Sequence, residues 1–382
     1  MANKSHRIMK RIGVTINLDS GLFSNGVNQN AIYLANLLKE IGYSVYLIYS
    51  LDKELEDIAG IKIINFKKAW NIPFDLIIQL GATCEQPIFD MFKKKKKDVK
   101  LVVYECGNKF IMDMEAIMFK PEEDYINSIR TKPHQIWSIP QMENTNIDYY
   151  RFLNRQEKAT VVPFIWEPLA IEDVMKDNGY DVYTKRDINR IGVLEPNRSV
   201  MKNILFPIMA LENYYNKYKD IDQVILYASE KIKHAKTFIS TINKLKLVKD
   251  GKIFANPREN TVDVVNKSID LILSWQWENN LNYLWLDVAW MGWPIVHNGS
   301  LCQDIGYYYE EFNSRNAVNM IKYAIENHND DIEYLNKNRK IIERYTHKNE
   351  KLKEQYKMLV ENVLNNRFEE YSYNWKTNSI SK

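Results

Sequence analysis

Short apolar runs alternate with amphipathic stretches along the first half of the chain, a pattern typical of strands separated by helices. The first apolar run, at 12–17, is followed by a polar loop at 19–26 and by a stretch at 30–41 whose apolar residues have helical spacing. Further strands are predicted at 43–49, 62–65, 76–79, 101–104, 135–138 and 160–164. Strands separated by helices favour a parallel, doubly wound sheet.

The same alternation starts again after a polar stretch at 168–187, which is predicted to be a linker. The second series comprises strands at 191–194, 223–227, 252–255 and 270–274, and helices at 201–218 and near 231–246. The fold class expected is therefore α/β, with two Rossmann-like domains that face across a cleft. The predicted division is an N-terminal domain at 1–167, a C-terminal domain at 188–355 and a helical tail at 356–382.

The segment at 271–298 is the richest in candidate chemistry. An apolar strand ends there in a polar turn, and the pattern predicts an amphipathic helix that opens with Glu278 and carries Asp287. Ligands of open α/β sheets bind outside the carboxyl ends of the strands, so this turn is a candidate binding site. Asn279 and Asp287 are eight residues apart, which would place them near one face of the helix. An acid on that face could accept hydrogen bonds from a ribose diol.

Two cations follow the first strand of the second series. Arg198 and Lys202 are four residues apart, and on a helix start they would project to one side. There they could bind a diphosphate, arginine as a fork and lysine as a point charge. The alternative is that both are solvated surface residues.

The first loop, at 19–30, is polar and rich in glycine and asparagine. Two of its glycines have the separation found in a P-loop, but the lysine that such a loop requires is missing, which argues against a nucleoside triphosphatase. The loop is either a turn that caps the next helix or a contact for a sugar or phosphate. The candidate contacts are Ser24, Asn25, Gly26 and Asn28.

Composition limits the remaining classes of function. The 382 residues are 45% hydrophobic, enough for about two domains, and no run of about 18 apolar residues predicts a transmembrane helix. The 52 Lys and Arg nearly balance the 49 Asp and Glu. Cys84, Cys106 and Cys302 are far apart and lack metal-ligand spacing, which favours a reduced, cytoplasmic protein without a bound metal. His297 ends a predicted strand and is interpreted as a core histidine.

One local run of charge, Lys93-Lys-Lys-Lys-Lys97, departs from this balance. The first interpretation is a solvated helix end or loop. The second is at most weak peripheral contact with an acidic membrane surface, because stable docking usually needs a larger cluster. No aromatic residues interleave with the run, so no nucleic-acid partner is expected.

The two-domain plan, the Arg198 and Lys202 pair and the segment at 278–296 resemble the GT-B glycosyltransferases, especially their large retaining group. The phrase Glu195-Pro-Asn-Arg-Ser-Val-Met-Lys-Asn203, together with Trp277-Glu-Asn-Asn-Leu-Asn282, is also similar to an uncharacterised branch of GT-B-like proteins in bacteria and large viruses. The resemblance covers nearly the whole chain in plan, and its specific motifs span about 40 residues.

In the retaining group the motif reads Glu-x7-Glu, followed by Ala-x-x-x-Gly-x-Pro-Val-Val. Matching Gly292 and Pro294 to that pattern puts the second family acid at Asp287 and the first at Asn279. Glu278 therefore stands one position early. The chain therefore departs from the family pattern at both acidic positions: an aspartate replaces the second glutamate, and the first is either replaced by asparagine or shifted to Glu278.

The resemblance implies a nucleotide-sugar donor that is bound mainly by the C-terminal domain. Arg198 and Lys202 would stabilise the leaving diphosphate in place of a metal ion, and Asp287 would hold the ribose. The residues that would face the donor sugar or pyrophosphate are Glu278, Asn279, Asn280 and Asn282.

The resemblance also implies an acceptor site in the N-terminal domain. It would lie near Ser24 to Asn28 and near the turn that begins with Glu105. If the enzyme inverts, Glu105 or Asp19 would be the first candidates for the general base. The last helix would cross back to this domain, and no metal or other cofactor would be required.

The function expected is thus transfer of a sugar from a nucleotide diphosphate to a glycan, lipid or small-molecule acceptor, with retention of configuration. Two alternatives stay open. A nucleotide-sugar epimerase of the same fold would need no acceptor, and a non-catalytic GT-B-like binding protein would account for the changed Glu-x7-Glu pattern.

Overall fold

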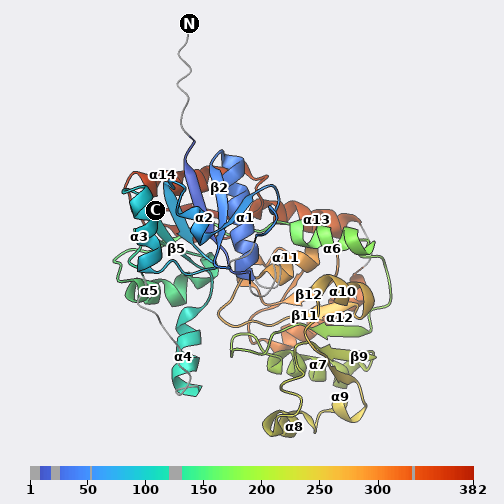
Figure 1. Ribbon diagram of the computed structural model, residues 1–382. Coiled ribbons are helices and arrows are strands. Elements are labelled where there is room, and N and C mark those ends of the chain that lie inside the picture. The colour runs from blue at the N-terminus through green and yellow to red at the C-terminus, as the bar shows by residue number, and fades with distance from the viewer. Residues whose placement is uncertain (1–8, 19–25, 52–53, 120–130, 329–331) are drawn as a thin grey trace. The chain divides into compact units, whose positions relative to one another are not determined.

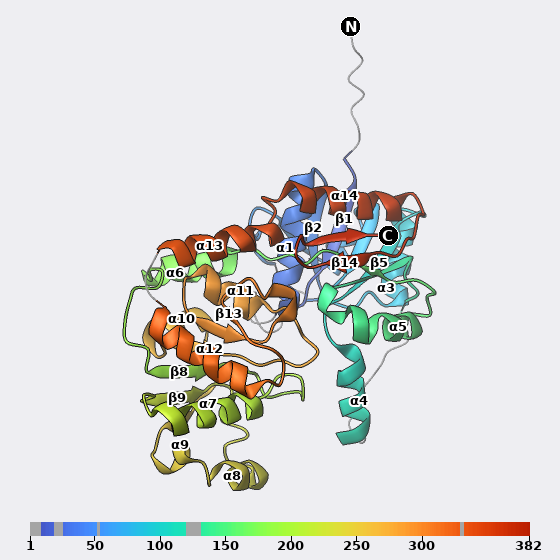
Figure 2. The same cartoon turned by 180° about the vertical axis from the view of Figure 1, so that it is seen from behind.

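The computed structural model describes residues 9–18, 26–51, 54–119, 131–328 and 332–382. The chain forms two compact units. Unit 1 consists of Met1–Glu167 together with Arg344–Lys382, and unit 2 consists of Pro168–Glu343. Each unit is built on its own parallel sheet (Figures 1 and 2).

Within the described residues of unit 1, the sheet has seven parallel strands in the order β3-β2-β1-β4-β5-β6-β7. Their bounds are β1 Arg11–Thr15, β2 Ser44–Tyr49, β3 Lys62–Asn65, β4 Leu76–Gln79, β5 Lys100–Glu105, β6 Gln135–Ser138 and β7 Thr160–Val161. The central strand is buried, and a Cβ on Gly13 would lie 2.5 Å from Ile48 Cδ1. Side chains from the neighbouring strands therefore fill the space above that glycine.

Helices and a short antiparallel pair complete unit 1. Their bounds are α1 Gly26–Ile41, α2 Phe66–Ala69, α3 Gln86–Lys95, α4 Lys109–Phe119, α5 Glu143–Asn154, α14 Glu350–Leu364, β14 Ser372–Asn374 and β15 Ser379–Ser381. Helix α1 starts at Gly26, before the predicted residue 30, and packs against β2 and α14 through a buried face that includes Leu34 and Leu38. The seventh strand is shorter than predicted, since pairing ends at Val161.

The lysine run at 93–97 lies at the end of α3. Lys96 Nζ pairs with Asp75 Oδ1 at 2.7 Å, and the Lys93 ammonium lies 4.7 Å from the centroid of the Phe89 ring. Cations in the last turn of a helix are also favoured by the helix dipole. These contacts support the interpretation of the run as a solvated helix end.

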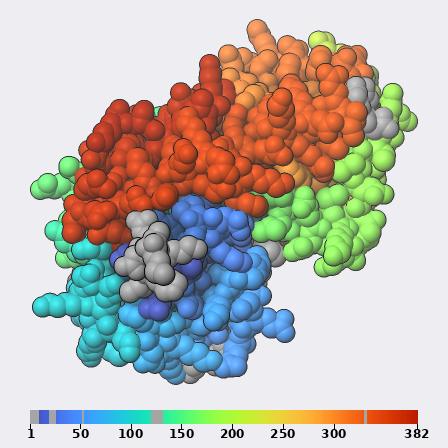
Figure 3. Space-filling model, turned by 90° about the horizontal axis from the view of Figure 1, so that it is seen from above, coloured from blue at the N-terminus to red at the C-terminus, as the bar shows by residue number. Residues whose placement is uncertain are grey.

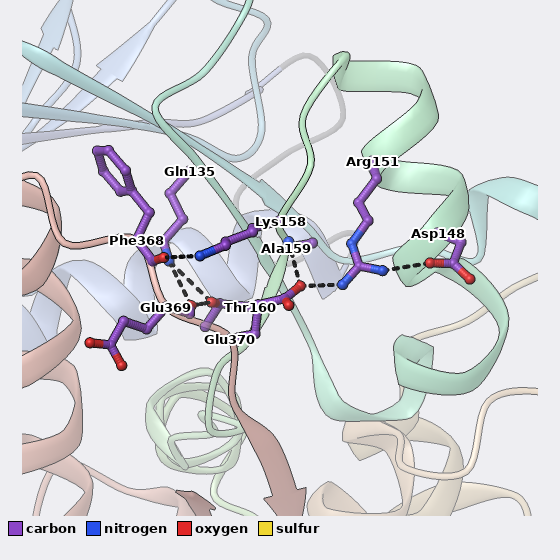
Figure 4. A network of polar contacts seen from close by, with 9 residues as sticks. All are labelled: Gln135, Asp148, Arg151, Lys158, Ala159, Thr160, Phe368, Glu369 and Glu370. Carbon is purple, nitrogen blue, oxygen red and sulfur yellow. Dashed lines mark hydrogen bonds and ion pairs between the residues drawn. The ribbon is translucent and has the colours of Figure 1, made fainter. Parts of the chain in front are cut away.

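The C-terminal segment docks onto the first part of unit 1. Figure 3 shows it in red beside the blue N-terminal part of the same unit. In Figure 4 the backbone carbonyl of Glu369 accepts hydrogen bonds from Thr160 Oγ1 and from Gln135 Nε2, the latter at 3.1 Å. The Glu370 carboxylate pairs with Arg151, which also binds Asp148 at 2.6 Å. The segment thereby covers the exposed edge of the sheet at β7.

Unit 2 has a six-stranded parallel sheet in the order β10-β9-β8-β11-β12-β13 within its described residues. The strands are β8 Arg190–Val193, β9 Gln223–Leu226, β10 Ile253–Ala255, β11 Leu271–Leu273, β12 Ile295–His297 and β13 Tyr307–Tyr308. The helices are α6 Leu169–Asn178, α7 Leu205–Tyr218, α8 Lys236–Ile242, α9 Lys246–Lys249, α10 Thr261–Lys267, α11 Tyr283–Trp290, α12 Ser314–Asn327 and α13 Ile332–Ile342. Helices α7 and α12 pack together, while α11 packs against α10 and α13 (Figure 2).

Several predicted elements of this half differ in the structure. Helix α6 occupies much of the stretch at 168–187 that was predicted to be a linker, because Ala170 and Ile171 are buried in unit 2. Helix α7 begins at Leu205, after the predicted residue 201. The single helix expected near 231–246 is two short helices, α8 and α9.

The docking of the C-terminus predicts a large effect for Asn378, whose side chain is 1% exposed. Its Oδ1 accepts from Phe164 N at 3.1 Å, and its Nδ2 donates to Phe164 O at 2.9 Å and to Arg344 O at 3.0 Å. Asn378→Ala leaves these backbone groups unpaired and places alanine at φ 44°, so we expect unit 1 to lose about 2–4 kcal/mol in urea unfolding. The exposed Asn374→Ala should change stability by less than about 0.5 kcal/mol. Equal losses in both variants would contradict the docking role.

Candidate functional site

The carboxyl ends of β8 and β11 mark the point where strand order reverses in the unit 2 sheet. The chain runs outward from β8 through β9 to β10, and then returns to the other side of β8 as β11. Crossovers leave this point in opposite directions, so a crevice opens there in doubly wound sheets. The residues that follow β8 and β11 form the candidate site.

A buried carboxylate holds the two strand ends together. Glu195, two residues after β8, is 0% exposed. Its Oε1 accepts from Ser274 Oγ at 2.5 Å and from Trp275 N at 3.3 Å, and its Oε2 accepts from Gln276 Nε2 at 3.2 Å. Burial raises the pKa of this carboxyl to about 7, against the hydrogen bond from Ser274 and the charge of Lys202, which lower it.

Gln276 connects the carboxylate to the start of α11. Its Oε1 accepts hydrogen bonds from Asn279 Nδ2 and, at 3.0 Å, from Asn282 Nδ2. Its backbone N–H donates to Asn298 Oδ1 at 2.9 Å, and Asn298 Nδ2 returns a bond of 2.7 Å to Gln276 O. Asn282 Oδ1 caps α11 by accepting from Leu284 N at 3.0 Å. The loop between β11 and α11 is therefore held by side-chain hydrogen bonds.

The two predicted phosphate-binding cations lie in a loop and not on a helix start. Ser199 and Lys202 form an isolated antiparallel bridge, and α7 begins only at Leu205. The bridge forms because Asn197, at φ 52°, turns the chain back and accepts from Ile204 N through its Oδ1 at 3.0 Å. This loop contacts the β11 loop directly through a 2.8 Å bond from Trp277 N to Met201 O.

The environments of these cations differ. Arg198 is exposed, and it makes no hydrogen bond or ion pair with the residues that the structure describes. Lys202 is partly buried, which lowers the pKa of its ammonium, while the negative charge of Glu195 opposes this. Lys202 therefore belongs to the network around Glu195, and Arg198 stands at the surface of the same loop.

The helix predicted to open with Glu278 begins later, at Tyr283. Asn282 supplies the cap, so Glu278, Asn279 and Asn280 lie in the preceding loop. Asn279 and Asp287 consequently do not share a face of one helix as expected. Asp287 is a partly exposed residue within α11.

Glu278 has an unusual conformation and an acidic neighbour. Its φ of 49° is strained for a residue with a side chain. Burial raises the pKa of Glu311, and the nearby negative charge of Glu278 raises it further. The backbone carbonyl of Asn280 accepts from Leu301 N at 3.1 Å.

His297, interpreted as a core histidine, is confirmed as one. It is 0% exposed and stacks on Trp285 with ring centroids 4.8 Å apart. Its Nδ1 accepts from Gly299 N at 3.0 Å, so Nε2 carries the proton and donates to Ile305 O at 2.8 Å. Burial lowers the pKa of His297 to about 4.

The remaining predicted residues belong to unit 1. Glu105 ends β5 and is partly exposed. Gly26 is the exposed first residue of α1, whereas Asn28 is buried within the first turn of that helix. Asp19, Ser24 and Asn25 lie outside the described residues.

Glu195, Ser274 and Gln276 are the site residues that sequence reasoning missed. Each follows the last residue of a buried strand by one to three positions, so the strand-end rule that selected Arg198 applied to them as well. Nearby, Trp275 is 4% exposed, and its Nε1 has no hydrogen-bond partner among the described residues. A buried donor without a partner costs about 1–3 kcal/mol, so a ligand atom at this position would recover that energy.

Neither a metal centre nor a membrane span emerges from the described residues. No group of three or more His, Cys, Asp and Glu side chains there could hold a metal ion. No helix in the described part of the chain is long and apolar enough to cross a membrane.

The sequence matches one protein family over most of its length. The profile of the family described as "Protein of unknown function (DUF2827)" matches residues 12–360. The chain belongs to the DUF2827 family. A sequence comparison with curated proteins gives no match.

Solved structures of glycosyltransferases resemble the chain over nearly its whole length. An alpha-glucosyltransferase in complex with UDP and a 13-mer DNA has a TM-score of 0.55 and 12% identity, over 92% of this chain and 100% of that one. The pneumococcal O-GlcNAc transferase in complex with UDP and GlcNAc has a TM-score of 0.53 and 11% identity, over 94% and 99%. The catalytic domain of starch synthase IV from Arabidopsis thaliana, bound to ADP and acarbose, has 0.54 and 7%, over 94% and 99%. The chain has the GT-B fold, as the resemblance predicted.

The buried groups predict opposite effects of acid on unit 2. Folded His297 resists protonation until about pH 4, whereas the unfolded side chain takes up a proton near 6.5, so stability is lost as pH falls through this window. Folded Glu195 keeps a proton up to about pH 7 and the unfolded carboxyl only to about 4.5, so acidification adds stability there. We expect urea unfolding at pH 7.5, 6 and 4.5 to show that the free energy of unfolding falls less with acidification in His297→Gln than in the parent, by on the order of 2–3 kcal/mol. In Glu195→Gln it should fall more than in the parent. Three parallel pH profiles would contradict these assignments.

Proposed function

We propose that the protein is a glycosyltransferase that moves a sugar from a nucleotide diphosphate to a glycan, lipid or small-molecule acceptor, with retention of configuration and without a bound metal. The observation that carries the proposal is the pairing of two loops at the switch point of the unit 2 sheet. One loop brings Arg198 and Lys202, and the other brings the amides around Gln276, with a direct backbone bond between them. Cations beside a rigid polar loop are suited to a diphosphate with an attached sugar.

The proposed roles follow from the surroundings of each side chain. Arg198 is exposed, so its guanidinium is available to a diphosphate at the surface of the loop. Lys202 adds a charge whose burial strengthens its attraction for a phosphate. Together they would neutralise the charge that develops on the leaving diphosphate, the role that a metal ion fills in other transferases. Asp287 would hold the ribose, and Glu278 would face the donor.

The acceptor is proposed to bind unit 1, near the turn that follows β5. Glu105 ends that strand, and the turn after it continues to Asn108, which is 2% exposed and accepts from Ile111 N at 3.2 Å. At the switch point of this sheet, between β1 and β4, the end of β1 is tied to the end of β4 by Thr15, whose Oγ1 accepts from Leu80 N at 2.9 Å. Gly26 and Asn28 at the start of α1 are further candidates for acceptor contacts.

The donor proposal is tested by nucleotide binding. A thermal-shift screen against UDP, GDP, dTDP, CDP, ADP and their sugars should raise the melting temperature with one nucleotide family. For that nucleotide, Arg198→Ala should weaken binding about 10- to 100-fold by calorimetry, because a charge-assisted contact contributes about 1.5–3 kcal/mol. Lys244→Ala, an exposed lysine on the same unit, is the control and should bind like the parent. Unchanged affinity in Arg198→Ala would contradict the phosphate site.

Metal independence has a separate test. Release of nucleoside diphosphate from the donor that the screen identifies should proceed at the same rate after dialysis against EDTA as with added Mg²⁺ or Mn²⁺. Loss of turnover that either cation restores would contradict the proposal that side-chain cations alone stabilise the leaving group. A product formed from the nucleotide sugar without any acceptor would favour the epimerase.

A further inference from the structure

The hydrogen bonds around Gln276 form a chain of fixed polarity. Above its pKa of about 7 the Glu195 carboxylate is ionised and can only accept, so the Gln276 group that faces it is the NH₂, at 3.2 Å. The Gln276 carbonyl oxygen then points the other way and accepts from the NH₂ groups of Asn279 and Asn282. The orientation of Gln276 therefore fixes which group of each asparagine faces it.

The far end of the chain fixes the same direction independently. Asn282 Oδ1 accepts from Leu284 N at 3.0 Å as the cap of α11, so only its NH₂ is left to face Gln276. A reversal of Gln276 would oppose two NH₂ groups or remove the helix cap. The orientation of Gln276 is therefore determined at one end by Glu195 and at the other by the start of a helix.

The third amide carries the consequence for a ligand. The NH₂ of Asn279 is used by Gln276, and Asn279 Oδ1 accepts no hydrogen bond from the residues that the structure describes. This oxygen is also absent from the buried polar atoms of the described residues that lack a partner, so it is not sealed off from solvent. Asn279 therefore presents an acceptor to the site, whereas the resemblance implied only that it would face the donor sugar or pyrophosphate.

We propose that Glu195 is a positioning residue which, through Gln276, makes Asn279 present its carbonyl oxygen to a hydroxyl group of the bound nucleotide sugar. The inference rests on the proposed donor site. Phosphate oxygens carry no proton to donate and are repelled by a carbonyl oxygen, so this position selects hydroxyl groups and leaves the diphosphate to Arg198 and Lys202. Glu195 acts on the ligand only through the amides and is not itself a contact.

A charge swap tests the polarity of the chain. In Glu195→Gln the acceptor-only constraint is lost, and in Gln276→Glu two carboxylates face each other, so each should weaken nucleotide-sugar binding about tenfold, the loss of one hydrogen bond. In the double variant the new glutamine at 195 donates to the new glutamate at 276, which again accepts from both asparagines. Affinity should return to within about threefold of the parent. Gln223→Glu is the matched control, because Gln223 is the first residue of β9 and the candidate site lies at the carboxyl ends of the strands.

Calorimetry of the four proteins with the nucleotide sugar, at a pH above the Glu195 pKa of about 7, gives the decisive comparison. Rescue in the double variant supports the chain of amides, because a merely structural loss from two buried substitutions would add. A double variant that binds no better than the weaker single variant overturns the inference. Failure of the proposed function has a different signature: the parent then binds no nucleotide sugar, while urea unfolding of the same four proteins still shows rescue by the second substitution. Binding by the parent without rescue in either measurement overturns the inference alone.

Discussion

The burial of one carboxylate, Glu195, is the constraint on which the candidate site depends. A buried charge is costly unless it is hydrogen-bonded, and the partners that satisfy Glu195 all come from the loop after β11. That requirement joins the ends of two strands that are adjacent in the sheet and about 80 residues apart in the sequence. The position of the β11 loop, the cap of α11 and the orientation of three amides follow from it.

Most strands of both parallel sheets could be predicted from the sequence, because buried parallel strands are short apolar runs that need no tertiary information to be recognised. The short edge strand β13 was not predicted, since its two tyrosines are only partly buried and form no such run. Helix starts were harder. The predicted helix at Glu278 begins at Tyr283, because Asn282 can cap it and the residues before it are held by Gln276. The loop that carries Arg198 and Lys202 could not be foreseen either, since it depends on the left-handed conformation of Asn197 and on its bond to Ile204.

The sequence drew attention to the loops after β8 and β11 but not to the buried residues that hold those loops together. Charged and exposed residues such as Arg198 attract attention in a sequence, whereas Glu195 and Gln276 are buried and act on their neighbours. A glutamate before proline has no pattern that reveals burial; its partners become visible only when β8 and β11 lie side by side. The fold does not determine the substrate, because the glycosyltransferases of the same fold include one solved with DNA and one solved with acarbose. Activity therefore has to be argued from the site itself.

We propose that the two loops at the β8 and β11 switch point form the donor site. Amide hydrogen exchange with and without a saturating nucleotide diphosphate tests it directly, because bound phosphate shields backbone amides that it contacts. We expect slower exchange at 194–203 and 274–282, the segments that contain Lys202 and Gln276. Protection confined to other segments of unit 2, or to unit 1 alone, would contradict it.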